Sequence, residues 1–357
     1  MNWRELNHRK NHFLRRLRMQ AARLILDKKN PRVFSSADLQ SIKHIVFLRN
    51  DDKLGDLLIS QLAYRELKKK LPQAKITVIA GPHSAQLLKY NPHVDQVCIC
   101  KRCFSSCWRV AAKLRKQQVD LFIDFDSENT DRTLLLLRQI SPRFAFGFNR
   151  QSVRLYNITT QFDFYIHHIT QWYESCFRRI GLGDIDTSYG LYLPEKAQVE
   201  ARAFLDMLPH RPVIALNMFA ASKHRCLSAA QIQTLCNAFP QLSFVLLGQP
   251  SQLKNYWRSK NLPANLILPL DNFSLFHSLA LLQQSTLLLT PDTMWVHAAC
   301  AFNKPLIALY KQSDTTNQTV WGPRTDNAHI IQMPDEFSQL PANVLIQALT
   351  EYLSIYF

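Results

Sequence analysis

Short apolar runs alternate with amphipathic segments along most of the chain. Between residues 44 and 148, five apolar runs of strand length are separated by segments with helical periodicity, and Pro or Gly marks several boundaries. The predicted strands are 44–48, 75–80, 94–100, 121–125 and 144–148, and the predicted helices are 57–71, 84–90, 107–117 and 130–140. This order predicts a parallel sheet with helices on both faces.

A second series of the same kind follows a break. Between about residues 150 and 211 only one helix, over 169–180, is predicted. The series then has predicted strands at 213–217, 243–247, 286–289 and 305–309, and predicted helices at 228–238, 275–284, 293–301 and 342–357. We therefore expect an α/β protein with two Rossmann-like, doubly wound domains facing a cleft, with ligands at the carboxyl ends of the strands.

The same pattern sets the expected domain boundaries. They are a basic amphipathic N-terminal segment over 1–40, a first domain over 41–185, a linker over 186–210, a second domain over 211–340 and a C-terminal helix over 341–357.

The N-terminal segment is strongly basic. Nine Lys or Arg residues against two acidic ones fall within residues 1–29. Apolar side chains recur on one predicted helix face, at Trp3, Leu6, Phe13, Leu17, Ala21 and Leu24. Such a helix can lie on an anionic membrane surface. It can equally pack against its own domain with a solvated basic side, and the pattern favours neither alternative.

Composition and charge narrow the class of protein. The 357 residues are 47% apolar and 20% charged, which excludes an intrinsically disordered chain. No run approaches the ~18 apolar residues of a membrane span, and the N-terminus lacks the apolar core of a signal peptide. We expect a soluble cytoplasmic protein whose net charge of +16 suits anionic partners.

Four of the eight cysteines lie close together in the sequence, at Cys98, Cys100, Cys103 and Cys107. Their spacing does not match the paired ligands of a zinc site. Disulfides are disfavoured in a chain without a secretory signal. We expect buried or half-exposed thiols, and no metal.

The loop after the first predicted strand is rich in charge. Residues 49–56, RNDDKLGD, hold three carboxylates and two cations, directly before a helix. Such a group suits acid–base chemistry or an anion site. The alternative is a solvated loop in which Asp56 caps the helix.

Three strand ends in the second half also carry candidate residues. Residues 290–297, TPDTMWVH, open a helix that Asp292 or Thr293 can cap, with the helix dipole facing any bound anion. Lys223 and Arg225 follow another strand and suit a phosphate-bearing ligand, although a surface loop is an equal alternative. Gly248 is a further turn at a strand end.

These segments together resemble a known enzyme family. Residues 49–58, RNDDKLGDLL, are similar to the opening motif of the ADP-heptose:lipopolysaccharide heptosyltransferases, glycosyltransferase family 9. Residues 290–310, TPDTMWVHAACAFNKPLIALY, resemble that family's second-domain signature, and residues 222–225, SKHR, resemble its Lys-Arg element. The resemblance covers about residues 42–330.

The resemblance implies an inverting, metal-independent glycosyltransferase of the GT-B fold. Its implied base is Asp56, with Asp51 and Asp52 as alternatives, and it has no cofactor beyond its nucleotide-sugar donor. The implied acceptor contacts, to the lipopolysaccharide inner core, are Arg49, Asn50 and Gly55. The implied donor contacts, to ADP-heptose, are Lys223, Arg225, Gly248, Thr290, Asp292, Thr293, Met294 and His297. On its own residues, His297 is more often a packed structural histidine than a ligand contact.

The resemblance also implies a location and leaves alternatives open. The enzyme is expected at the cytoplasmic face of the inner membrane, as a peripheral protein on an anionic surface. Nucleic acid is not an expected partner. Met294 stands where the family has Gly, and the loop at 49–56 has an extra adjacent carboxylate. The alternatives are a GT-B transferase for another nucleotide sugar, an inactive scaffold of that fold, and a non-catalytic basic protein that binds nucleic acid.

Overall fold

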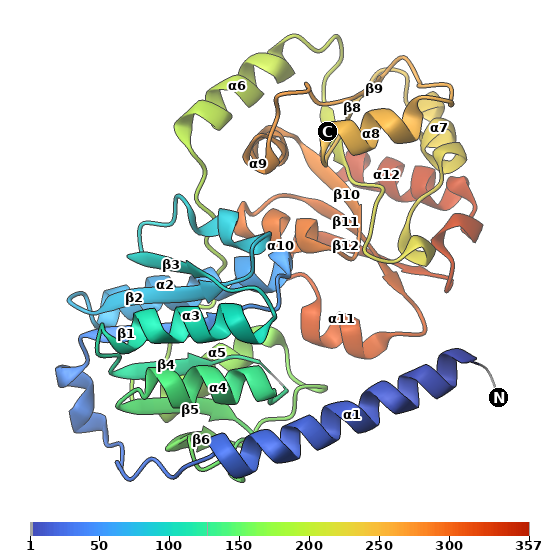
Figure 1. Cartoon of the computed structure of the whole chain (residues 1–357). Helices are drawn as coiled ribbons and strands as arrows, with labels where there is room; N and C mark the ends of the chain where they lie inside the picture. Colours follow the sequence, from blue (N-terminus) through green and yellow to red (C-terminus); the bar gives the residue numbers. More distant parts are fainter. Residues whose placement is uncertain (1–2, 127, 357) are drawn as a thin grey trace. The chain divides into compact units, whose positions relative to one another are not determined.

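Two six-stranded parallel sheets, one in each half of the chain, organise the protein (Figure 1). The computed structural model describes residues 3–126 and 128–356, and it separates into a first unit that ends at Thr187 and a second that begins at Ser188. The predicted class, two Rossmann-like α/β domains, is confirmed.

The elements of the first unit follow the predicted alternation. Its strands are β1 (His44–Arg49), β2 (Lys75–Ala80), β3 (Gln96–Ile99), β4 (Leu121–Asp124), β5 (Phe144–Phe148) and β6 (Ile158–Thr160). Its helices are α1 (Trp3–Leu26), η1 (Ser36–Ser41), α2 (Leu54–Lys70), η2 (Ser84–Leu88), α3 (Phe104–Arg115), α4 (Asp131–Ile140) and α5 (Ile169–Arg179). The strand order is β3-β2-β1-β4-β5-β6.

Both faces of this sheet are covered, so its central strands are mostly apolar and buried. β1 is buried at every position. On one face, Val46 and Phe122 pack with Val110 of α3 and Leu134 of α4. On the other, the Phe47 ring lies 5.0 Å from Tyr64 of α2, and Phe125 lies 4.4 Å from Tyr173 of α5. Burial on both sides explains why continuous apolar runs, rather than alternating ones, marked these strands.

The helix α1 packs on its own unit through a face other than the predicted apolar stripe. Met19, Ala22 and Leu26 contact the core beside α4, and Arg23 donates to the Ser152 hydroxyl at 2.7 Å. The stripe residues Leu17, Ala21 and Leu24 are exposed. The side chains of Trp3, Leu6 and Phe13 lie outside the described residues. The helix thus packs on its domain and still presents apolar side chains to solvent.

The second unit repeats the topology of the first. Its strands are β7 (Val213–Leu216), β8 (Ser243–Leu246), β9 (Leu266–Ile267), β10 (Leu287–Pro291), β11 (Leu306–Lys311) and β12 (Ala328–Met333). Its helices are α6 (Glu195–Asp206), η3 (Lys223–Arg225), α7 (Ala229–Ala238), α8 (Pro250–Trp257), α9 (Leu275–Gln284), α10 (Met294–Ala301), α11 (Thr315–Trp321), η4 (Phe337–Gln339) and α12 (Ala342–Tyr356). The order β9-β8-β7-β10-β11-β12 matches that of the first sheet, counted from each unit's own first strand.

Each sheet therefore has one topological switch point. Helices on either side of it cover opposite faces of the sheet, which leaves a crevice where ligands of this fold bind. In the first unit the switch lies between β1 and β4, where Leu48 pairs with Asp124. In the second it lies between β7 and β10, where Leu216 pairs with Leu289. The register sets Arg49 beside Phe125 and Asn217 beside Thr290.

The connection between the units is more ordered than the linker predicted over 186–210. Residues Glu195–Asp206 form α6, which packs on α9 of the second unit. The C-terminal helix α12, predicted as a separate element, packs on α7 of the same unit through Leu345 and Leu349. Among the described residues, no helix has the length and apolar character needed to cross a membrane.

Candidate functional site

The loop that joins β1 to α2 holds a buried cation between two carboxylates. Arg49 ends β1 and is 3% exposed. Its Nη2 lies 3.3 Å from Oδ2 of Asp56 and 3.9 Å from Oδ2 of Asp51. Its Nη1 donates to the carbonyl of Phe125 at 3.5 Å, across the switch point. The guanidinium therefore ties the loop to the end of β4.

Asp51 and Asp56 share a hydrogen bond and titrate as a pair. Burial raises the pKa of Asp56 to about 7, the neighbouring Asp51 adds to the rise, and Arg49 opposes it. Burial also acts on Asp51, but Arg49 and the hydrogen bond from Asp56 hold its pKa below the ordinary value. As the pH falls, Asp56 therefore takes up a proton before Asp51, with its midpoint near neutral pH. A carboxyl with a pKa near 7 suits general base catalysis.

Asp52 is turned away from this pair. Its backbone has a φ of 64°, and its Oδ1 accepts hydrogen bonds from the backbone N–H groups of His83 at 2.8 Å and Ser84 at 2.7 Å. A Cβ on Gly81 would lie 2.3 Å from that oxygen, so glycine is required for this approach. Asp52, one of the three candidates for the base, holds the loop to the end of β2.

The other residues expected to contact the acceptor have different surroundings. Asn50 is 8% exposed and its amide donates to Sγ of Cys100 at 4.0 Å. Gly55 lies in the first turn of α2. Arg49 is enclosed by carboxylates rather than open to solvent. Asp56 lies in the first turn of α2 but does not cap it, because the N-cap residue is Lys53.

A second group of carboxylates follows β4 and was not predicted from the sequence. Tyr156 donates to Oδ2 of Asp124 at 2.5 Å, and Nη2 of Arg150 lies 3.6 Å from the same oxygen. Asp126 follows on the loop, and burial together with the charge of Asp124 raises its pKa to about 7, against the opposing effect of Arg49. The sequence shows the motif Asp-Phe-Asp at the end of an apolar strand, but only the pairing of β4 with β1 places these carboxylates near Arg49.

At the switch point of the second unit, hydroxyl and amide groups connect the strand ends. Asn217, just after β7, donates to Oγ1 of Thr290 at 2.9 Å and to Oγ1 of Thr293 at 3.3 Å. Thr293 is the N-cap of α10 and accepts from the backbone N–H of Trp295. The start of α10, with its positive dipole end, therefore lies at the end of β10. Met294 is its first residue and is half-buried.

Asp292 has two charged or polar partners from different loops. Nη1 of Arg225 lies 2.7 Å from its Oδ2, and the Asn317 amide donates to the same oxygen at 2.5 Å. Burial raises the pKa of Asp292, while Asn317 and Arg225 oppose the rise. Arg225 and Asp292, predicted separately, are thus brought together. Asn317 was not predicted, because it comes from the unpredicted helix α11.

The remaining residues predicted to contact the donor are Lys223, His297 and Gly248. Lys223 is exposed on η3, and among the described residues its ammonium has no carboxylate partner. His297 is 4% exposed, with its ring 5.9 Å from that of Tyr189, as expected of a packed histidine. Gly248 follows β8 with a φ of 141°, a conformation that favours glycine.

The cysteine cluster lies beside the first loop. Cys98, Cys100 and Cys107 are buried and Cys103 is exposed, and all eight cysteines are free. The Sγ atoms of Cys100 and Cys107 lie 3.5 Å apart. Within the described ranges, no three His, Cys, Asp or Glu side chains are grouped so that they could hold a metal ion.

Comparison with known proteins shows which family the chain matches. Residues 107–343, about two thirds of the chain, match the model of glycosyltransferase family 9 (heptosyltransferase). The loop with Arg49 and Asp56 lies outside that segment, so the comparison does not assign its residues. The match begins within α3 and runs past β12, and it includes all three candidate strand ends of the second unit.

Relatives and solved structures agree with that match. A protein of Escherichia coli (strain K12) named "Putative lipopolysaccharide heptosyltransferase 4" is 26% identical over 80% of each chain. A "Putative glycosyltransferase" of Haemophilus influenzae is 24% identical over 88% of this chain and 94% of its own. A family 9 glycosyl transferase from Veillonella parvula has the same fold, with a TM-score of 0.73 at 18% identity, over 87% of this chain and 97% of its own. E. coli heptosyltransferase WaaC, solved with ADP, has a TM-score of 0.67 at 17% identity, over 87% and 99%.

Proposed function

The chain belongs to glycosyltransferase family 9, the heptosyltransferases, and from this premise we propose that it moves heptose from ADP-heptose to the inner core of lipopolysaccharide, with inversion at the anomeric carbon. It is a glycosyltransferase of that family. The donor, the stereochemistry and the acceptor are our proposal. The observation that carries it is the Asp51–Asp56 pair at the switch point of the first unit, with the pKa of Asp56 at about 7.

Asp56 acts as the base in a single displacement. The acceptor hydroxyl oxygen forms a bond to the anomeric carbon of the donor sugar, and the bond from that carbon to the diphosphate breaks. The hydroxyl proton passes to Asp56, and the nucleoside diphosphate leaves. Asp51 stays ionised and keeps the pKa of Asp56 near the working pH, and Arg49 holds both carboxylates in place.

The second unit takes the donor. Lys223 and the N-terminus of α10, capped by Thr293, would balance the charge that develops on the leaving diphosphate. These groups do the work that a metal ion does in other transferases, which supports a metal-independent reaction. Asp292 would contact the donor sugar, with Arg225 and Asn317 fixing its carboxylate. WaaC, which shares this fold, was solved with ADP, and this supports an adenine nucleotide.

The proposed acceptor is part of a membrane lipid, so the enzyme would work as a peripheral protein on the cytoplasmic face of the inner membrane. The exposed Leu17 and Leu24 of the basic helix α1 support this location.

Titration calorimetry with ADP, UDP and GDP tests the donor. Tighter binding of ADP, followed by release of ADP from ADP-heptose when a lipopolysaccharide core acceptor is added, is the expected result. A clear preference for UDP would overturn the choice of donor.

A second candidate is transfer of a different sugar from another nucleotide, favoured by Met294 where the family has Gly. The Met294 side chain at the start of α10 restricts how closely a diphosphate approaches the backbone. The Met294→Gly variant tests this: if ADP-heptose is the donor, the substitution tightens ADP binding, and if it is not, the preference for another nucleotide persists.

A further inference from the structure

One rim of the first sheet carries exposed apolar side chains at both of its edges. The strands are parallel, so the ends of β1 to β6 lie on one rim, called here the carboxyl rim. β3 and β6 are the two edge strands, and β1 and β4 are the central pair. At ~4.8 Å between strands, the edges are about 24 Å apart. The Asp51–Asp56 pair lies between them, after β1.

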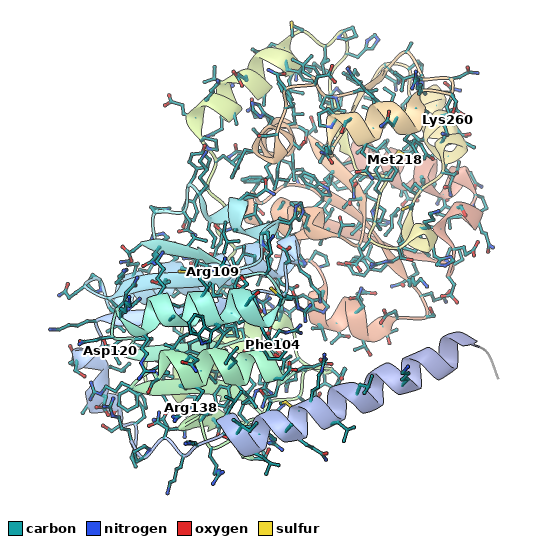
Figure 2. All side chains as sticks on the ribbon, viewed as in Figure 1. Phe104, Arg109, Asp120, Arg138, Met218 and Lys260 are labelled. Atoms are coloured by element: carbon teal, nitrogen blue, oxygen red, sulfur yellow. The ribbon has the colours of Figure 1, made fainter. Side chains whose placement is uncertain are left out.

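The first apolar group follows β3. Ile99 ends that strand and is 57% exposed. Phe104 begins α3 and Trp108 lies one turn later on the same helix face, with 48% and 57% exposure. Figure 2 shows Phe104 and Asp120, which precedes β4, at opposite ends of this unit. Ile99 is therefore exposed at the edge strand, and Phe104 and Trp108 are exposed on the helix that follows it and crosses one face of the sheet.

The second apolar group follows β6, at the other edge. Tyr165 and Ile166 form the tip of the loop to α5 and are 74% and 64% exposed. The loop beneath them is braced, because the rings of Phe164 and Trp172 lie 4.3 Å apart and the backbone N–H of Tyr165 donates to Asp163 at 2.9 Å. These contacts hold the loop in one conformation, so the exposure of Tyr165 and Ile166 does not result from poor packing of the loop.

Basic side chains surround the first group. Lys101 and Arg102 lie between Ile99 and Phe104, and Arg109 follows Trp108; all three are exposed. The carbonyl of Arg102 accepts from Nη1 of Arg132 at 2.8 Å, which fixes this turn against α4. Aromatic and aliphatic side chains interleaved with Lys and Arg fit the interface of an anionic bilayer, where rings enter the headgroup layer and cations pair with phosphates.

The helix α1 reaches the same rim. Nε of Arg18 lies 3.6 Å from Oδ2 of Asp131, the first residue of α4 and hence at the carboxyl rim. The amide of Asn30 donates to the carbonyl of Arg143, just before β5 and hence at the opposite rim. The part of α1 before Arg18 therefore continues past the carboxyl rim (Figure 1). It exposes Leu14 and Leu17, at 46% and 45%.

We propose that the carboxyl rim of the first unit is a docking surface for an anionic phospholipid membrane, seated through Phe104 and Trp108 at the start of α3 and through Tyr165 and Ile166 after the edge strand β6. Docking in this way directs the Asp51–Asp56 pair at the headgroup layer, where a lipid-linked hydroxyl is presented. The inference deepens the proposed function and rests on it only for the identity of that hydroxyl. The surface itself follows from exposure and charge.

Sedimentation of the full chain with vesicles tests the surface. Vesicles of phosphatidylethanolamine with phosphatidylglycerol are compared with neutral phosphatidylcholine vesicles. We expect the double variants Phe104→Ser/Trp108→Ser and Tyr165→Ser/Ile166→Ser each to lower the bound fraction at least tenfold on anionic vesicles. The matched control is Tyr90→Ser, an exposed aromatic beside Lys89 that precedes β3 rather than following it. Unchanged binding of both double variants, or an equal loss in Tyr90→Ser, overturns the proposal.

Charge is tested separately. Neutralising Lys101, Arg102 and Arg109 with Gln should weaken binding to anionic vesicles by about fivefold per charge. The control neutralises three exposed lysines at the opposite rim, Lys43, Lys70 and Lys116, and should change binding by less than twofold. If instead the chain binds DNA with the same charge dependence and ignores the aromatic variants, the rim binds nucleic acid and the membrane proposal fails.

Further measurements distinguish a loss of membrane binding from a loss of folding and from a failure of the proposed function. Thermal unfolding of each variant must match the wild-type chain, and the emission of Trp108, taken as the difference from Trp108→Phe, should shift to the blue on anionic vesicles. Sugar transfer to an acceptor dissolved in detergent should be unaffected by the rim variants. If the wild-type chain transfers no sugar at all, the proposed function fails, whereas the vesicle results still decide the docking surface.

Discussion

The guanidinium of Arg49 lies 3.3 Å from the carboxylate of Asp56, yet the pKa of Asp56 is raised to about 7. A neighbouring cation alone would lower it. Burial and the hydrogen-bonded Asp51 outweigh the cation, so Asp56 gains and loses its proton near neutral pH while Asp51 stays ionised. The group is therefore both held in place and able to accept a proton near neutral pH.

Replacing Asp56 by Asn should remove the base and leave the donor site intact. We expect the turnover number for sugar transfer to fall by about 10²–10⁴, while the affinity for ADP changes less than twofold. Release of ADP and calorimetry measure the two effects. Asp38→Asn, which removes a carboxylate paired with Arg143 away from the site, serves as the control. Turnover near the wild-type value in Asp56→Asn would contradict the assigned base.

The pH profile should report the carboxylate pair. Because the base must be deprotonated and its pKa is about 7, kcat/KM should fall as the pH drops below 7, approaching tenfold per unit. Asp51→Asn removes a charge and a hydrogen bond that raise the pKa of Asp56, so the acid limb should move to lower pH with activity retained. Asp126 also has a pKa raised to about 7. Asp126→Asn should leave the limb in place, and a limb that moved in this variant instead would assign the titration to Asp126.

Removing Arg225 should weaken donor binding through Asp292. Arg225→Gln breaks the 2.7 Å ion pair and leaves the Asp292 carboxylate with Asn317 as its hydrogen-bonding partner. Loss of a hydrogen bond between charged groups costs about 1.5–3 kcal/mol, which corresponds to at least about tenfold in KM for the donor. Steady-state kinetics measures the effect, with the exposed Arg258→Gln as the control. An unchanged donor KM would place Asp292 outside the donor site.

Replacing Arg49 by Met should destabilise the first unit. Two buried carboxylates would lose their cation, a change that costs about 3–5 kcal/mol in other proteins. Urea unfolding, followed by a probe in the first unit, should show a lower midpoint. Adding Asp51→Asn to Arg49→Met removes one of the stranded charges and should restore part of the loss. If the single variant is as stable as the wild-type chain, Arg49 does not hold the loop.

The central strands could be predicted because both of their faces are buried. β1, β2, β4, β5 and β7 appear in the sequence as short, mainly apolar runs, and that pattern needs no knowledge of their neighbours. The edge strands β6 and β9 have only three and two residues, and β12 has a mixed burial pattern, so none of them gave a clear signal. The parallel sheets and their doubly wound class could be predicted from the alternation of strands and helices alone, whereas the strand order came from the structure.

Much less of the candidate site could be predicted. The charges of residues 49–56 and the Asp-Thr pair at 292–293 stand directly after strands, so their local positions marked them. The separation of Asp52 from Asp51 depends on a backbone turn and on the space left by Gly81, which no local pattern shows. Arg150, Tyr156 and Asn317 reach their partners only through strand pairing and helix packing.

The C-terminal helix α12 stays with the second unit, and this has a consequence for how donor and acceptor specificity can be exchanged between genes. Because α12 packs on α7, the described residues from Ser188 onward belong to one unit, and the described chain passes between the units once. Under the proposed function, the residues that select the acceptor and those that select the donor occupy separate, uninterrupted stretches of the gene. A single recombination event near codon 188 could therefore join the acceptor choice of one enzyme to the donor choice of another without breaking either hydrophobic core.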